Sequence, residues 1–95
     1  MNVKIDGIRR SITGILLRNG ARKAALFGSI VRGEATEESD IDLLVEFEGR
    51  RSLLDLAGLK IELQDLLGRS VDVLTYDSLH PLLRERIMSE QEVIL

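Results

Sequence analysis

Apolar residues recur at close to helical spacing in two long segments of the chain. The first segment, Val3–Asn19, has an apolar residue at about every third or fourth position and runs into Gly20, which is typical of a helix end. The second segment, Ser52–Leu67, carries a stripe of leucines, and Ser52 and Asp55 at its start have the spacing of a capping box. We therefore predict two long helices, each with an apolar face turned toward a core.

Short apolar or alternating segments lie between and after these helices and predict the strands of a small sheet. They are Ala24–Phe27, Ile41–Phe47, Val71–Tyr76 and a final short strand, Val93–Leu95. A last helix is expected after the third of these strands, with Pro81 in its first turn and Asp77 or Ser78 as its N-cap. Strands that alternate with helices predict an α/β (α+β) fold, a small mixed sheet flanked by helices. The chain of 95 residues is expected to form a single domain over 1–95.

The composition is that of an ordinary globular protein, with 44% hydrophobic and 31% charged residues. The net charge of -3 argues against a general nucleic-acid binder, which is usually basic. The chain has no cysteine and one histidine, His80, so disulfides, thiolate catalysis and zinc sites built from thiolates or several histidines are excluded. No apolar run is long enough to cross a bilayer, and the N-terminus lacks the apolar region of a signal peptide. We therefore expect a cytoplasmic protein that does not enter a membrane.

The most informative segment combines two aspartates with an apolar strand. Asp40 and Asp42 flank Ile41, and the apolar run of the predicted strand continues beyond Asp42. Residues two apart in a strand point to the same face, so both carboxylates can approach one point. Carboxylates in such a strand are costly unless a cation neutralises them, and a pair of divalent metal ions would do so. Asp72, in the next predicted strand, is the candidate third ligand if the two strands pair.

A glycine–serine turn precedes the aspartates and has the features of a phosphate-binding turn. Gly28 permits a positive φ or a close approach of the backbone to a ligand. Ser29 would open a short helical turn over Ile30–Gly33, whose free N–H groups attract an anion. Arg32 has a bidentate donor fork that suits phosphate, and Ser39 could either bind a phosphate or cap the turn before the strand. A phosphate-binding turn beside metal-binding carboxylates is what nucleotidyl transfer requires.

Each of these features also has a simpler explanation when it is taken alone. The turn could do no more than cap a helix, the paired aspartates could belong to a surface turn, and Asp72 could keep an edge strand soluble. A calcium-binding loop is excluded because its glycine and its late glutamate are missing at the required spacings. The order of the three features, on a strand–turn–helix and on two strands, favours a joint function.

Together these residues resemble the signature of the nucleotidyltransferase superfamily, and most closely that of the minimal nucleotidyltransferases (MNT). The matching residues are Gly28, Ser29, Arg32, Gly33, Ser39, Asp40, Ile41, Asp42 and Asp72, followed by the VDVLTY and LHPLLRERI segments. The resemblance implies a polymerase-beta-like palm core that binds ATP or another nucleoside triphosphate. It also implies two Mg²⁺ ions, with Mn²⁺ as a substitute, held by the catalytic residues Asp40, Asp42 and Asp72. The residues that it assigns to the nucleotide are Gly28, Ser29, Arg32 and Ser39.

The same resemblance implies a partner. MNT proteins often accompany a small helical HEPN toxin that cleaves RNA, and they act as its antitoxin, in some cases by adenylylating a tyrosine of the toxin. We therefore expect AMP transfer from ATP to a hydroxyl of such a toxin. The chain is too short to hold a second domain that grips an acceptor, so we expect a hetero- or homo-oligomer. The wide apolar surface around Leu54 and Ile61 offers a docking face.

Two alternatives to this function stay open at this point. The protein could be a binding module that neutralises a toxin by contact alone. It could also transfer a nucleotide to a small molecule, as antibiotic-modifying enzymes do, although the missing second domain disfavours this.

Overall fold

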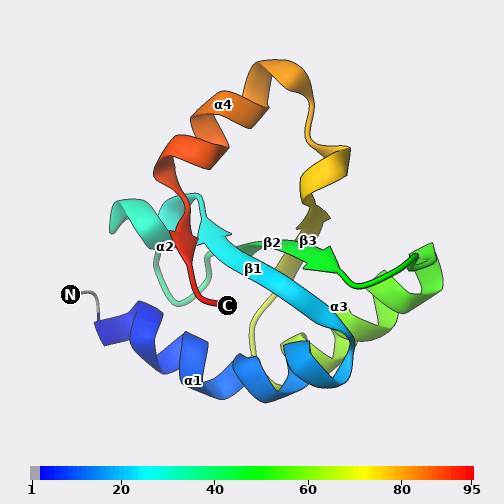
Figure 1. Cartoon of the computed structure of the whole chain (residues 1–95). Helices are drawn as coiled ribbons and strands as arrows, with labels where there is room; N and C mark the ends of the chain where they lie inside the picture. Colours follow the sequence, from blue (N-terminus) through cyan, green and yellow to red (C-terminus); the bar gives the residue numbers. More distant parts are fainter. Residues whose placement is uncertain (1–2) are drawn as a thin grey trace.

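The structure is a computed structural model that describes residues 3–95. Its centre is a four-stranded sheet with the strand order β3-β2-β1-β4 (Figure 1). The elements are α1 (Val3–Arg18), β1 (Ala21–Phe27), α2 (Ser29–Arg32), β2 (Ile41–Phe47), α3 (Leu53–Leu67), β3 (Val71–Thr75), the 3-10 helix η1 (Tyr76–Ser78), α4 (Pro81–Glu90) and β4 (Glu92–Val93). β1 pairs antiparallel with β2 and β4, whereas β2 and β3 are parallel and are joined through α3. The predicted fold class, a small mixed sheet flanked by helices, is confirmed.

The two faces of the sheet are covered differently. On one face, α1 and α3 contribute Ile12, Leu16, Leu59 and Leu63 to the larger core, together with alternate strand residues such as Leu43. The other face carries a smaller cluster, in which η1 and α4 pack on the sheet. Its buried members are Ala25, Phe27, Leu44, Tyr76, Leu79 and Ile87. The alternation of strand residues therefore sends one set into the main core and the other set toward α4.

The first strand begins three residues earlier than the sequence predicts. Ala21 is buried and lies opposite Phe47 at the far end of β2. The charged residues Arg22 and Lys23 lie in the added part of the strand, and both find partners on other elements of the fold. Arg22 forms an ion pair with Glu46 at 3.0 Å, and the Lys23 ammonium lies 4.7 Å from the centre of the Tyr76 ring.

The last helix has a different N-cap from the one predicted. Its cap is His80, whose Nδ1 accepts a hydrogen bond from the Leu82 N–H at 3.1 Å, and Pro81 is the first helical residue. The predicted caps, Asp77 and Ser78, lie in η1 instead. The reason is that η1 is fixed to the sheet by its buried tyrosine, so the chain must run on before a new helix can start.

The final strand is also displaced from its prediction, because the paired residues are Glu92 and Val93 rather than Val93–Leu95. Ile94 is buried, and its N–H donates to the Ala24 carbonyl at 2.9 Å.

The leucine stripe of α3 is narrower than the sequence predicts. The capping box of Ser52 and Asp55 is present, but of the helix residues only Leu59 and Leu63 are buried. The expected stripe also held leucines that are largely exposed in the structure. Exposed apolar residues of α3 are Leu53, Leu54, Ile61 and Leu66. Within residues 3–95, no helix combines the length and the apolar character that crossing a membrane would demand.

Candidate active site

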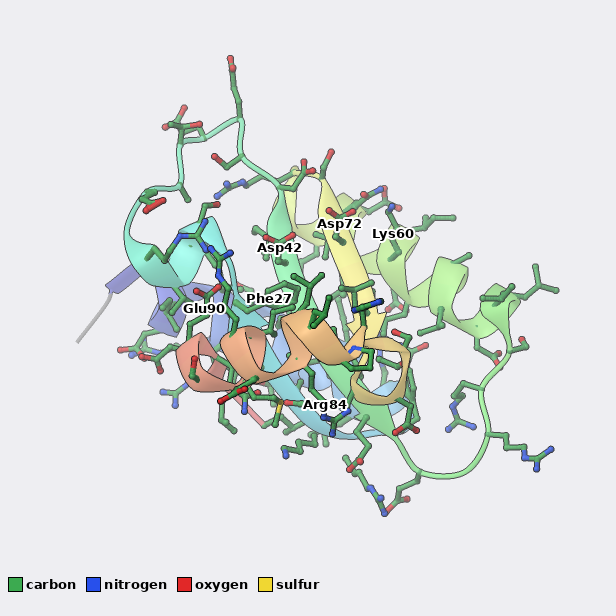
Figure 2. The ribbon with its side chains drawn as sticks, turned by 90° about the horizontal axis from the view of Figure 1, so that it is seen from above. Phe27, Asp42, Lys60, Asp72, Arg84 and Glu90 are labelled. Carbon is green, nitrogen blue, oxygen red and sulfur yellow. The ribbon has the colours of Figure 1, made fainter. Side chains whose placement is uncertain are left out.

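Asp42 and Asp72 lie side by side on the face of the sheet that α4 covers. They are direct partners in the parallel pairing of β2 and β3, each one residue past the start of its strand. Their neighbours along the strands, Ile41 and Val71, point into the main core, so the two carboxylates point to the opposite face. Figure 2 shows the two side chains next to each other at one end of the sheet. Asp40 directly precedes β2 and is exposed.

The electrostatic surroundings of Asp42 disfavour its ionised form. Its pKa is raised above the ordinary value, first by partial burial and then by the negative charges of Asp72 and Asp40. Arg32 opposes this shift, and Glu90 adds to it. Lys60, whose ammonium lies 3.9 Å from a carboxylate oxygen of Asp72, supplies some positive charge at the outer side. The cluster as a whole is therefore short of cationic partners.

Gly28 lies directly against Asp42 at the end of β1. Phe27 is paired with Asp42, and the next residue turns sharply with a φ of 76°. A Cβ atom on Gly28 would lie 2.2 Å from Oδ2 of Asp42, a distance at which no side chain fits. Both the backbone conformation and the close approach therefore require glycine here. Ser29 then begins α2, and the N–H groups of Val31 and Arg32 both bond to the Gly28 carbonyl.

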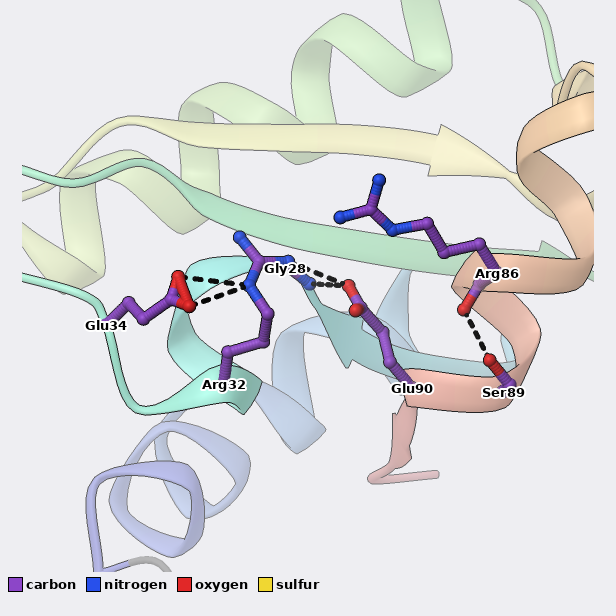
Figure 3. A network of polar contacts seen from close by, with 6 residues as sticks. All are labelled: Gly28, Arg32, Glu34, Arg86, Ser89 and Glu90. Atoms are coloured by element: carbon purple, nitrogen blue, oxygen red, sulfur yellow. Dashed lines mark hydrogen bonds and ion pairs between the residues drawn. The ribbon is translucent and has the colours of Figure 1, made fainter.

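Arg32 does not point freely into solvent but lies between two carboxylates. Its Nε is 3.1 Å from Glu34, and its Nη1 is 3.1 Å from Glu90 at the end of α4 (Figure 3). The same Glu90 oxygen accepts the Gly28 N–H at 2.9 Å. The hydrogen bond to Glu34 is the main reason that the pKa of Arg32 is raised, so its charge is retained.

Ser39 takes the second of its two predicted roles in this structure. Its hydroxyl accepts the Thr36 N–H at 2.9 Å and so caps the turn before β2. Arg69 donates to the carbonyls of Thr36 and Ser39 at 2.8 and 2.6 Å. The loop that leads into Asp40 is therefore held by the Ser39 hydroxyl and by the guanidinium of Arg69.

The sequence missed two residues of this site, Glu90 and Arg69. Glu90 is 62 residues away from the Gly28 amide that it contacts, and no local pattern links them. Arg69 has a weak signal, because it stands close before the strand that carries Asp72.

The donor set at this edge fits a hard divalent cation. Its members are carboxylates, the ligands that Mg²⁺ prefers, and partial burial together with the charges of Asp72 and Asp40 raises the pKa of Asp42. Among residues 5–95, no three acidic or histidine side chains are already gathered closely enough to hold a metal ion. Repelling carboxylates are expected to stand apart until a cation draws them together. Asp40, Asp42 and Asp72 are thus neighbours on one edge rather than a finished metal cage.

The carboxylates of the site can be reached from solvent, because Asp40 and Asp72 are exposed and Asp42 is half-buried. Two hollows of about 330 Å³ each lie elsewhere. One is at the opposite end of β2 and β3, beside Arg51 and Tyr76, and the other lies between α1 and Arg69. A chain of this shape leaves the surroundings of the carboxylates accessible to a large acceptor.

Comparison with known proteins agrees with this geometry. The profile of the family described as nucleotidyltransferase domain matches residues 9–94. A protein of Methanocaldococcus jannaschii, named provisionally as a protein adenylyltransferase, is 53% identical over 93 residues, which cover 98% of this chain and 100% of the relative.

Solved structures show the same fold. A minimal nucleotidyltransferase structure, also named provisionally, has a TM-score of 0.81 at 44% identity and covers 94% of this chain and 91% of the other. A complex of tri-AMPylated Shewanella oneidensis HEPN toxin with MNT antitoxin contains a chain with a TM-score of 0.75 at 20% identity, over 95% of this chain and 71% of that one. At 20% identity, the similarity to this second structure shows a shared fold and nothing further. On the family match and the close relative together, this chain belongs to the nucleotidyltransferase domain family and is a nucleotidyltransferase.

Proposed function

We propose that this protein is a Mg²⁺-dependent adenylyltransferase that moves AMP from ATP to a tyrosine hydroxyl of a HEPN-type toxin, and thereby acts as an antitoxin. The observation that carries the proposal is the pairing of Asp42 with Asp72, directly against a glycine that can have no side chain. This arrangement places carboxylates beside a turn whose backbone can approach phosphates closely. Residues 1–95 would form a single minimal nucleotidyltransferase domain.

The carboxylates and the turn would have separate roles. Asp40, Asp42 and Asp72 would hold the divalent ions, two by analogy with other phosphoryl-transfer sites, with Mn²⁺ as a substitute. Bound there, the ions neutralise charge on the triphosphate and on the attacking oxygen. The Gly28 N–H, the Ser29 turn and the Arg32 fork would hold the phosphate oxygens, since charge-assisted bonds from such donors are strong. Ser39 would act indirectly, through the turn that leads to Asp40.

In the proposed reaction, the acceptor hydroxyl gives its proton to solvent and its oxygen bonds to the α-phosphorus of ATP. The bond from the α-phosphorus to the bridging oxygen breaks, and pyrophosphate leaves on the opposite side. The raised pKa of Asp42 supports a role as a metal ligand, because a cation is what would restore its charged form. Replacing Asp42 would therefore abolish AMP transfer, while the contacts between the turn and the nucleotide would remain.

The acceptor is proposed to be a protein because the carboxylates lie on an open edge. In the Shewanella oneidensis complex, an AMPylated HEPN toxin is bound to an MNT antitoxin, which supports the same class of acceptor here. In a hetero-oligomer with the toxin, the toxin would supply the acceptor hydroxyl. ATP is the proposed donor because the toxin in that complex carries AMP.

A second function, neutralisation by contact alone, is favoured by one observation. The outer face of α3 presents Leu54 at 84% exposure and Ile61 at 58%, which is unusual for large apolar side chains unless they meet another protein. A contact-only antitoxin would rely on such a face and not on the carboxylates.

The deciding experiment incubates a HEPN-type toxin with ATP, Mg²⁺ and a small amount of this protein, followed by intact mass measurement. The enzyme predicts that the toxin gains one or more AMP units and stays inactive after this protein is removed. Asp40→Asn/Asp42→Asn should still bind the toxin but leave it unmodified and active. Asp65→Asn, an exposed carboxylate on α3, is the matched control and should behave as the unchanged protein.

The contact-only function predicts the opposite pattern. Neutralisation would then require stoichiometric protein, would survive the double substitution, and would fail in Leu54→Glu or Ile61→Glu. An unmodified toxin that the double variant neutralises equally well would refute the enzymatic function.

A further inference from the structure

The last residue of α4, Glu90, places its carboxylate on the phosphate-binding turn. A single oxygen, Oε1, accepts the Gly28 N–H at 2.9 Å and also lies 3.1 Å from Nη1 of Arg32. The Glu90 side chain is only 21% exposed, so it is packed into this position rather than extended into solvent. Figure 3 shows it facing Arg32 from the end of α4.

These are two of the donors that the proposed function assigns to the triphosphate. A backbone amide has one hydrogen, and it cannot donate fully to Glu90 and to a phosphate at the same time. Arg32 is also committed on its other side, where Nε contacts Glu34 at 3.1 Å. In the free protein, the carboxylate of Glu90 therefore occupies the place beside Gly28 and Arg32 that a phosphate oxygen would take when a nucleotide binds.

Two features suggest that this contact can be released. The negative charge of Glu90 acts against Asp42 and adds to the repulsion within the carboxylate cluster. In addition, α4 buries a single residue, Ile87, while its residues from Pro81 to Arg86 are exposed. Figure 1 shows α4 on one side of the sheet, between η1 and β4. A modest shift of its end would free the turn.

We propose that Glu90 is an internal competitor for the triphosphate site, and that a bound nucleoside triphosphate displaces its carboxylate from Gly28 and Arg32. The proposal rests on the function proposed above, because it takes the turn as the place of the phosphates. In the free protein, Glu90 keeps the Gly28 amide and the Arg32 fork oriented. Nucleotide binding then exchanges one anion for another and moves the end of α4.

The test measures binding of a non-hydrolysable ATP analogue with Mg²⁺ by calorimetry. Glu90→Gln keeps the size of the side chain but removes the charge, and Glu90→Ala removes the competitor altogether. Both variants should bind the analogue about threefold to tenfold more tightly, the range expected for loss of a partly exposed charged contact. Glu85→Gln, an exposed glutamate on the same helix, is the matched control and should bind as the unchanged protein does.

A second measurement follows the Gly28 amide by nitrogen-15 NMR. The free unchanged protein and free Glu90→Gln should differ at this amide, because the charged acceptor is lost. With the analogue at saturation the two spectra should agree at Gly28, since phosphate has replaced Glu90 in both. A difference that persists at saturation would mean that Glu90 stays in place, and would overturn the proposal.

The outcomes distinguish the competitor role from the proposed function. Equal or weaker binding by both Glu90 variants, with normal binding by the unchanged protein, would overturn the competitor role and leave the proposed function standing. Absence of analogue binding by every variant would overturn the proposed function together with this inference.

Discussion

At the scale of single residues, Asp42 is the carboxylate of this site whose pKa is shifted by its surroundings. Partial burial and the charges of Asp72 and Asp40 raise its pKa, and a side chain at the neighbouring Gly28 would collide with its carboxylate. A carboxyl with a raised pKa in the folded protein binds a proton more tightly there than in the unfolded chain. The free energy of unfolding contributed by this group is therefore highest at low pH and falls as pH rises through its unfolded and folded pKa values.

Asp42→Asn is expected to stabilise the metal-free protein at neutral pH. The substitution removes one repelling charge, and after allowance for solvent screening we expect a rise in Tm of roughly 2–4 °C. The gain should shrink as the pH falls, because the carboxyl of Asp42, whose pKa is raised, then takes up a proton in the unchanged protein as well. Thermal unfolding at several pH values in the presence of a chelator measures both effects. A loss of stability at pH 7 would show that the carboxylate is better compensated than its surroundings indicate.

The candidate carboxylates could be found from the sequence because strand parity is a local property. Alternation along β2 and β3 sets the face of Asp42 and Asp72 without knowledge of the rest of the chain. Glu90 could not be found, because its contact with Gly28 depends on how α4 returns across the sheet. Ser39 stayed ambiguous since only the geometry of its loop decides between a phosphate and a turn. The roles of these residues in metal and nucleotide binding stay predictions.

At the scale of elements, the sequence predicted the ends of a helix well where residues close in sequence form its caps. The box of Ser52 and Asp55 is present at the start of α3, and Gly68 ends that helix with a φ of 65°. The start of β1 and the cap of α4 were predicted wrongly because distant partners decide them. Arg22 is held by Glu46 across the sheet, and the buried Tyr76 keeps the chain in η1 before α4 can begin.

Ser52→Ala should destabilise the protein by about 1 kcal/mol, which lowers Tm by roughly 4–8 °C. The reason is that the Ser52 hydroxyl accepts the Asp55 N–H at 3.2 Å, and alanine leaves this amide without its cap. Chemical denaturation gives the free energy difference directly. Ser70→Ala, at an exposed serine after the same helix, should change stability by less than half as much. Equal effects of the two substitutions would mean that the cap contributes little to α3.

At the scale of the whole molecule, ligands that bind at the carboxylate edge are expected to stabilise the folded protein. Mg²⁺ with a non-hydrolysable ATP analogue should bind the folded state alone and raise Tm, with Mn²⁺ able to replace Mg²⁺. A ligand at one hundred times its Kd stabilises by about 2.7 kcal/mol, so the expected rise is roughly 10–20 °C. Asp40→Asn/Asp42→Asn should lose most of this rise. A rise of the same size in the double variant would place the ligand elsewhere on the molecule.

The strand order also has a consequence for how the chain folds. Phe27 and Asp42 are close in sequence, and β2 reaches β3 through the single helix α3. In contrast, β4 pairs with β1 only after nearly the whole chain has been placed, as in the pairing of Ala25 with Val93. Closing so long a loop costs more entropy and is slower than local pairing. The carboxylates and the glycine turn are therefore expected to come together before Glu90 reaches Gly28, so the nucleotide site would assemble in an open form before its internal competitor could close it.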